Sequence, residues 1–271
     1  MLKLSRSYLS QSALYLHCFI YLSLIFLVFN FNDLYHSLDT EFGLVELTGA
    51  ASLFVTSIIL FLSSLKVKRN FGTKDLRFKL LLGASILFFW AAGEEISWGQ
   101  HFFGFHTPPW LAAVNDQNET NIHNMNKKFF DRYLERLTFL LAFITAILHF
   151  RGKEFFLGLK MPEYPLNMAF ILVPIYRKLE SIYGYDIWPI GFLVFFGYPI
   201  LGIIKKDAKI LLHSLLFLFT TGMVIYFHHN NLVLFRGNSN IFHEVKEMMF
   251  SILCIFFSLQ LYRNLHITKD S

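Results

Sequence analysis

Two adjacent carboxylates, Glu94 and Glu95, interrupt a long apolar stretch of this 271-residue chain. His101 follows shortly after them. Carboxylates and imidazoles are the side chains that most often transfer protons in enzymes, so these three residues are candidate general acids or bases. If the helix continues through this stretch, Glu94, Ser97 and His101 share one face. Glu95 then points elsewhere, toward Trp98.

A second set of carboxylates and imidazoles has the composition of a metal site. Metal sites in helical bundles use Glu and His side chains from facing helices. Glu119 and His123 are four residues apart, so both could hold one ion if the segment is helical. His243 and Glu247 repeat this spacing at the start of the last predicted helix. These four residues are the predicted ligands of a divalent cation such as Zn²⁺ or Ca²⁺.

Four further polar residues are candidates for holding a substrate. If the segment from Asn115 to His123 is extended instead of helical, its alternate residues face one side and could bind a cation or a polar headgroup. Arg236 carries the fork of donors that holds phosphate or carboxylate groups. His228 and His229 lie close before it and complete the set.

Structural roles are open for some of these residues. A single glutamate inside a membrane often makes a hydrogen bond between helices, which is an alternative role for Glu46 and for one member of the adjacent pair. The stretch 101–110 could be a hairpin at the membrane interface, ended by its prolines and anchored by its aromatic side chains.

The elements that must position these residues are helices of a membrane protein. The chain is 55% hydrophobic and 16% charged, against about 25% charged residues in a soluble domain. Its apolar residues form long runs, which is the pattern of bilayer-spanning helices. Eight runs lie at 13–30, 43–65, 79–101, 137–150, 164–176, 187–204, 210–227 and 245–262. We therefore predict an all-α, polytopic bundle of about eight membrane helices, forming a single integral membrane domain over residues 1–271. Two of the runs are short, so six or seven spans are also compatible with the pattern.

The basic residues predict the orientation of the chain. Five segments hold 16 of the 24 Lys and Arg residues, namely 1–12, 66–79, 151–163, 205–209 and 263–271. The positive-inside rule places these segments, and with them both termini, in the cytoplasm. The net charge of +5 is then a consequence of topology, and no nucleic-acid partner is expected.

Depth along the helices places most of the candidates in one layer. Glu94 lies about 22 Å along a helix from Lys79, in a hydrocarbon layer about 30 Å thick. Glu247 has a similar depth, about 24 Å when counted from Arg263. Carboxylates at this depth must pair, become protonated or line a wet cavity. These positions predict an outward-facing site in the outer third of the membrane, with 98–136 as an outer loop that carries an interfacial or re-entrant segment.

Two strings in this region resemble a signature of uncharacterised bacterial multi-pass membrane proteins. They are GEEISWGQ at 93–100 and NDQNETNIHN at 115–124. The resemblance implies a bacterial source and a single site formed by both strings, and it implies no activity. With the orientation predicted from the basic residues, the expected location is a bacterial inner membrane with the site facing the periplasm. The glutamate pair is also similar to the Glu-Glu motif of the CAAX-processing intramembrane proteases, but Gly99 stands where that motif has arginine.

Three classes of function are compatible with these observations. The first is a hydrolase or transferase with a membrane-embedded site, acting on a lipid or lipid-linked substrate. The second is an ion-coupled or proton-coupled transporter, which often shows internal repeats and a midplane site; the sequence shows neither. The third is a sensor or assembly subunit that binds a cation or a partner at the outer face. Membrane lipids are the expected partners, and the sequence predicts no oligomeric state.

Overall fold

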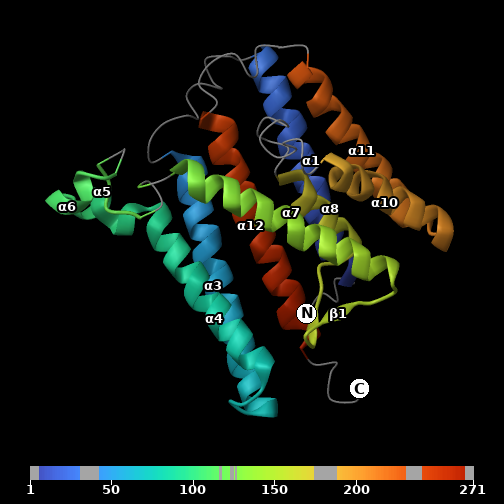
Figure 1. Cartoon of the computed structure of the whole chain (residues 1–271), viewed down its shortest axis with the longest axis horizontal. Coiled ribbons are helices and arrows are strands. Elements are labelled where there is room, and N and C mark those ends of the chain that lie inside the picture. Colours follow the sequence, from blue (N-terminus) through green and yellow to red (C-terminus); the bar gives the residue numbers. More distant parts are fainter. Residues whose placement is uncertain are drawn as a thin grey trace.

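The computed structural model describes the backbone of residues 6–30, 43–115, 118–122, 125, 127–173, 188–229 and 240–265. Most of these residues are helical (Figure 1). The described strands form one antiparallel hairpin, in which β1 (Phe155–Phe156) pairs with β2 (Leu159–Lys160). The prediction of a helical protein is therefore confirmed in its coarser form, since the described residues are mostly helical and include this one short hairpin.

Each of the eight apolar runs overlaps a helix. The helices are α1 (Arg6–Asn30), α3 (Leu44–Phe71), α4 (Leu76–Glu95), α7 (Lys127–Phe150), α8 (Tyr164–Leu172), α10 (Trp188–Lys205), α11 (Ala208–His229) and α12 (Asn240–Asn264). Among the residues that the structure describes, three stretches have the length and composition of a membrane span, namely α3, α4 and residues Glu244–Asn264 of α12. The chain is thus compatible with membrane insertion, and the count of eight spans stays a prediction.

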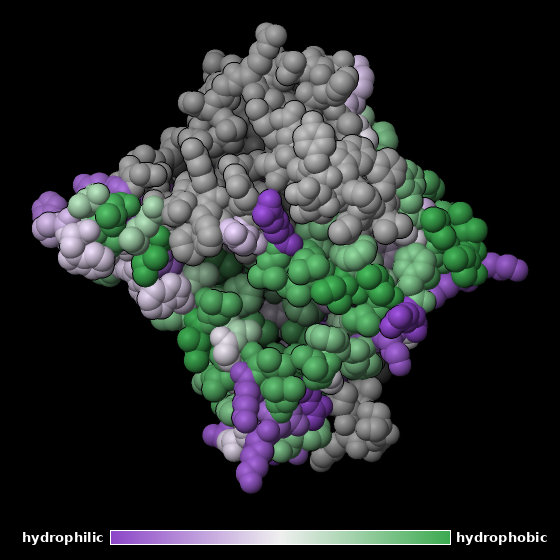
Figure 2. Space-filling view, viewed as in Figure 1, coloured by the Kyte–Doolittle hydropathy of each residue, from purple (hydrophilic) through white to green (hydrophobic). Residues whose placement is uncertain are grey.

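Helices α4, α3 and α12 lie side by side in that order (Figure 1). The outward sides of α3 and α4 carry many large apolar side chains, including Phe54, Phe61, Leu87 and Phe89. Figure 2 shows hydrophobic residues across the middle of one face of the molecule and hydrophilic residues mainly toward its edges. Exposed apolar surface of this extent is typical of contact with lipid.

Helix α8 lies at the centre of the second group of helices. All its residues from Pro165 to Leu172 are buried, and α1, α7, α11 and α12 pack around it. A helix that is apolar on every side is stable only inside a protein or a bilayer. At nine residues, α8 is too short to cross about 30 Å of hydrocarbon, as its short apolar run predicted.

The described residues of the segments predicted to be cytoplasmic lie toward the same end of the helices, along the bottom and lower right of Figure 1. Three hydrogen bonds lie at this end. Ser10 Oγ donates to Glu163 Oε2 (2.9 Å), which joins two of the segments. Lys66 Nζ donates to the Tyr262 carbonyl (3.0 Å) and Lys205 Nζ to the Tyr164 hydroxyl (2.9 Å), and each acceptor directly flanks another segment. A common end is what a single cytoplasmic side requires. The side of a membrane on which this end lies stays a prediction.

The first turn of α4 is held at this basic end by Asp75. Its carboxylate accepts a hydrogen bond from the Arg77 amide (2.8 Å) and lies 2.7 Å from the Arg77 guanidinium. The hydrogen bonds from Arg77 lower the pKa of Asp75 below its ordinary value. A capping carboxylate at a helix N-terminus is a common start signal, so this end of α4 follows directly from the local sequence.

Candidate functional site

The other end of α4 departs from the sequence-based prediction. The helix ends at Glu95 instead of continuing to His101, and the next residues turn left-handed. The backbone φ angles of Ser97, Trp98 and Gly99 are +46°, +54° and +81°. A left-handed conformation costs roughly 1–2 kcal/mol for a non-glycine residue, so it persists only where the surroundings impose it. The expected shared helical face is therefore replaced by a tight turn.

Trp98 folds back over the last turn of α4. A Cβ atom added to Gly93 would lie 2.8 Å from the Trp98 indole, so a glycine at this position makes room for the ring. The Trp98 ring also meets the Trp90 ring edge-on, with centroids 5.0 Å apart. The two glycines of the GEEISWGQ string thus serve the turn: Gly93 admits the indole, and Gly99 adopts the positive φ.

Glu94 is buried, with 7% of its surface exposed, and both its carboxylate oxygens accept hydrogen bonds. Oε1 accepts from Trp98 Nε1 (2.9 Å), and Oε2 accepts from the Ile122 backbone amide (2.6 Å). Hydrogen bonds to a charged acceptor are the strong ones. Glu94 therefore fastens the segment 118–122 to the end of α4.

Glu119 connects this segment to the turn and lies beside His101. Its Oε2 accepts hydrogen bonds from Ser97 Oγ (3.0 Å) and Asn121 Nδ2 (2.8 Å). Its Oε1 lies 3.4 Å from His101 Nε2. The His101 side chain is 38% exposed and the Glu119 side chain 16%, so an accessible imidazole stands against a mostly covered carboxylate.

The remaining hydrogen bonds close the network. Asn115 Nδ2 donates to the Asn121 carbonyl (2.8 Å), and Asn115 Oδ1 accepts from the Glu119 amide (3.1 Å). The Thr120 amide donates to Gln100 Oε1 (2.6 Å). Thr107 Oγ1 donates to the Asn118 carbonyl (2.6 Å). We call this network the clasp; it comprises Glu94, Ser97, Trp98, Gln100, His101, Thr107, Asn115 and residues 118–122. The clasp joins the two strings that the sequence singled out, and within it Asn115 holds the segment 118–122.

Glu95 points away from the clasp, into the layer of long helices. Its Oε1 lies 3.7 Å from the position of a Cβ added to Gly49 in α3, and Met248 Cα of α12 lies 3.6 Å from the same position. The expectation that Glu95 faces Trp98 is therefore wrong, because Glu94 is the residue that bonds the indole. The two adjacent glutamates therefore have different surroundings. Glu94 belongs to the clasp, and Glu95 lies at the junction of α3, α4 and α12.

Sequence reasoning missed a buried lysine in α12. Lys246 of α12 is 2% exposed and directly precedes Glu247, one of the predicted ligands. Burying an ammonium group is costly unless it has partners, and Lys246 is not without one. The charge pattern of the sequence already singled out this residue. Of the 24 Lys and Arg residues, sixteen lie in the predicted inner segments and seven in the predicted outer ones, and the remaining one, Lys246, lies within a predicted membrane helix.

Several predicted site residues fall where their side chains are not described. His123 and Arg236 lie outside the described residues, and only the backbone is described for His228, His229 and His243. Among the side chains that the structure does describe, no group of three or more His, Cys, Asp or Glu residues could hold a metal ion. Of the four predicted ligands, only Glu119 and Glu247 have described side chains. The metal therefore stays a prediction.

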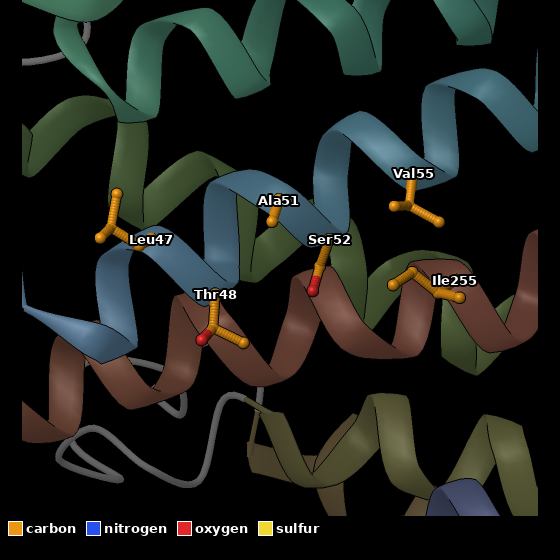
Figure 3. A pocket seen from close by; sticks show the side chains of 6 residues that line it. All are labelled: Leu47, Thr48, Ala51, Ser52, Val55 and Ile255. Carbon is orange, nitrogen blue, oxygen red and sulfur yellow. The ribbon is translucent and has the colours of Figure 1, made fainter. Parts of the chain in front are cut away.

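A shallow groove of about 290 Å³ lies elsewhere, between α3 and α12 (Figure 3). Its lining is Leu47, Thr48, Ala51, Ser52, Val55 and Ile255. The Thr48 hydroxyl is turned onto its own helix, where it donates to the Leu44 carbonyl (2.6 Å). The groove contains none of the predicted site residues, and its lining lacks the groups that acid–base chemistry needs.

Comparison with known proteins adds no assignment. No protein-family model matches the chain. Searches of the curated proteins and of the solved structures found no significant match. Any functional conclusion therefore rests on the geometry of this chain alone.

Proposed function

We propose that the chain is a membrane-embedded hydrolase or transferase that acts on a lipid or lipid-linked substrate, with His101 and Glu119 as its acid–base pair. The observation that carries the proposal is the 3.4 Å approach of the exposed His101 imidazole to the covered Glu119 carboxylate. An imidazole oriented by a carboxylate is a recurring general base, because the carboxylate fixes the tautomer and stabilises the imidazolium that forms.

The two nitrogens of His101 then have different roles. Nε2 faces Glu119 Oε1, so an Nε2–H donates to the carboxylate and Nδ1 takes the proton from an attacking water or hydroxyl group. The same proton passes from Nδ1 to the leaving group when the bond to it breaks. Glu119 stays in place during this cycle because Ser97 and Asn121 hold its other oxygen.

In this proposal Glu94 and Glu95 support the site and do not touch the substrate. Glu94 is a positioning residue, since both its oxygens already accept hydrogen bonds inside the clasp. Glu95 lies on the far side of α4, at the junction with Gly49 and Met248. The clasp faces the periplasm of a bacterial inner membrane, since the basic segments gather at the opposite end of the helices.

A metal-dependent form of the proposal adds a divalent cation held by Glu119 and His123, with His243 and Glu247 completing the ligands. Arg236, His228 and His229 would then contact an anionic headgroup. Element analysis of purified, active protein tests this form. A preparation that is active without bound metal overturns it and leaves the His101–Glu119 pair as the whole of the acid–base machinery.

The test of the proposed function uses the intact protein in vesicles of a total bacterial lipid extract, with mass spectrometry of lipids and lipid-linked molecules before and after incubation. His101→Asn should lower the rate of product formation by about 10²–10⁴-fold, the usual contribution of a general base. Glu119→Gln should lower it as well, and His106→Asn is the matched control, since His106 is an exposed histidine of the same segment. A wild-type protein that converts no component of the extract, or a His101→Asn variant with full activity, overturns the proposal.

A sensor or assembly subunit is the second candidate. Both oxygens of Glu94 accept hydrogen bonds from within the protein. This favours the second candidate, because in it the clasp only holds a binding surface in place. It predicts that His101→Asn changes no lipid and that Glu94→Ala, which opens the clasp, removes binding of a partner.

A further inference from the structure

We propose that residues 100–114 form a rigid wedge that inserts into the headgroup region of the bilayer leaflet beside the clasp. We call these residues the wedge; they contain the short helices α5 (Gln100–Phe103) and α6 (Pro109–Ala112). Figure 1 shows α5 and α6 projecting sideways from the end of α4, away from α12.

The wedge exposes large aromatic side chains. Phe102 is 60% exposed, Phe103 81%, Phe105 40% and Trp110 70%. Four such side chains within nine residues are far more apolar surface than an ordinary surface turn shows to water, and contiguous patches of this kind mark contact with a membrane or a protein. Something apolar therefore covers the wedge in the working protein.

The absence of charge favours lipid as the covering. Residues 96–115 contain no Asp, Glu, Lys or Arg, although Glu95 and Asp116 flank them directly. A segment that enters the interfacial region of a bilayer must leave formal charges outside. Tryptophan is enriched at this depth, because its ring is amphipathic.

The wedge is also continuous with the apolar surface of α4. Leu87 and Trp90 of α4 are 66% and 48% exposed, and Trp90 meets Trp98 at the base of the wedge. Since α4 has the length and composition of a membrane span, its exposed side faces lipid. The same lipid-facing surface passes from α4 through the two tryptophans to the wedge, which lies at the level where the span ends.

Hydrogen bonds of the clasp hold the wedge in one shape. Gln100 and Thr107, one at its start and one in its middle, are joined to each other (3.0 Å), and Thr107 and Gln100 are also bonded to Asn118 and Thr120. Pro108 and Pro109 restrict the chain between Phe105 and Trp110. A preorganised apolar tip enters a bilayer without the cost of ordering a flexible loop.

Insertion places the clasp at headgroup depth, because His101 directly precedes Phe102 in α5. The consequence for substrate, which rests on the proposed function, is that the site takes amphiphiles whose headgroup arrives sideways from the leaflet and not molecules dissolved in water. The insertion itself requires no catalysis.

Fluorescence quenching tests the insertion in the full-length protein. A bimane label is attached to Phe103→Cys in a background without Cys18 and Cys254, which are both buried. The protein is placed in phosphatidylcholine–phosphatidylglycerol nanodiscs. A label on Thr73→Cys, an exposed residue of the turn between α3 and α4, is the control, and Phe105→Cys is the second wedge position in case Phe103→Cys does not fold.

Nitroxide lipids labelled at the headgroup or high on the acyl chain should quench the wedge labels several-fold more than aqueous iodide does. The Thr73 label should show the reverse preference. Iodide quenching of the wedge labels as strong as that of the Thr73 label overturns the proposal. So does shielding from both quenchers with self-quenching between copies, because a second copy of the chain then covers the wedge. Neither result depends on product formation, so failure here and failure of the proposed function are distinguishable.

Discussion

Two polar networks in this protein are built around a histidine, and they are built differently. In the clasp, His101 stands beside Glu119 at a left-handed turn, with its side chain 38% exposed. In the second network, the Tyr198 hydroxyl lies 2.9 Å from His149 Nδ1 and accepts a hydrogen bond from Asn167 Nδ2 (2.6 Å). His149, Tyr198 and Asn167 are 5%, 0% and 1% exposed.

The second network ties three helices together. Its members come from α7, α8 and α10, all from regular helical positions, and Asn167 also bonds the Ala142 carbonyl (2.9 Å). A buried polar network that satisfies its own members specifies how helices pack. The clasp satisfies its buried carboxylate in the same way but leaves an imidazole at the surface. Access, more than residue type, therefore separates a site that could do chemistry from a structural brace.

Opening the clasp should have the largest effect. Glu94→Ala leaves the Ile122 amide and the Trp98 indole without their acceptor, and each hydrogen bond to a charged group contributes about 1.5–3 kcal/mol. We expect product formation to fall at least about 100-fold, as for His101→Asn. Hydrogen exchange at the amides of residues 118–122 should accelerate in the same variant. Unchanged exchange would mean that Glu94 does not hold this segment.

Breaking the second network should affect stability and not turnover. Tyr198→Phe removes the hydroxyl between His149 and Asn167, which costs about 1–3 kcal/mol for each buried group that loses its partner. Denaturant unfolding in detergent measures the loss, and activity per folded molecule measures turnover. A Tyr198→Phe variant that is stable but inactive would reverse the roles that the comparison assigns.

Crowding the turn should have a similar or smaller effect, and α4 offers its own control. A methyl group on Gly93 meets the Trp98 ring at 2.8 Å, whereas one on Gly83 meets nothing within 4 Å. Gly93→Ala should lower stability by about 1–3 kcal/mol, the usual cost of overpacking. Gly83→Ala should raise it by roughly 0.5–1 kcal/mol, because alanine is the better helix residue. Equal thermal shifts in the two variants would contradict the folded-back position of Trp98.

The smallest effect is expected at the opposite end of α4. Because Arg77 lowers the pKa of Asp75 in the folded protein, this carboxylate adds stability above its ordinary pKa of 3.8, and the contribution is lost as the pH falls through the lowered value. Asp75→Asn should cost about 1 kcal/mol at pH 7, within the range for a helix cap. The difference from wild type should shrink toward pH 3. A difference that is constant with pH would mean that the charge of Asp75 plays no part.

The helices and the meeting of the two strings were within reach of the sequence. Long apolar runs form helices wherever water is excluded. The two polar strings, 93–100 and 115–124, lie on either side of an uncharged segment, so each is the nearest source of hydrogen-bond partners for the other. The left-handed turn was not predictable in this way, because Ser97 and Trp98 have no preference for positive φ and only Gly99 indicates a break. Once the helix ends at Glu95, the direction of every following side chain changes, and this is why Glu94 and not Glu95 meets Trp98.

The reactivity of the histidines tests this difference in access most directly. Diethyl pyrocarbonate modifies accessible, unprotonated imidazoles, and mass spectrometry of the intact protein in vesicles at pH 7 resolves the rate at each position. His101 should react at a measurable rate, and His149 should react only after unfolding. A His149 that reacts as fast as His101, or a His101 as inert as His149, would contradict the division into an accessible site and a sealed brace.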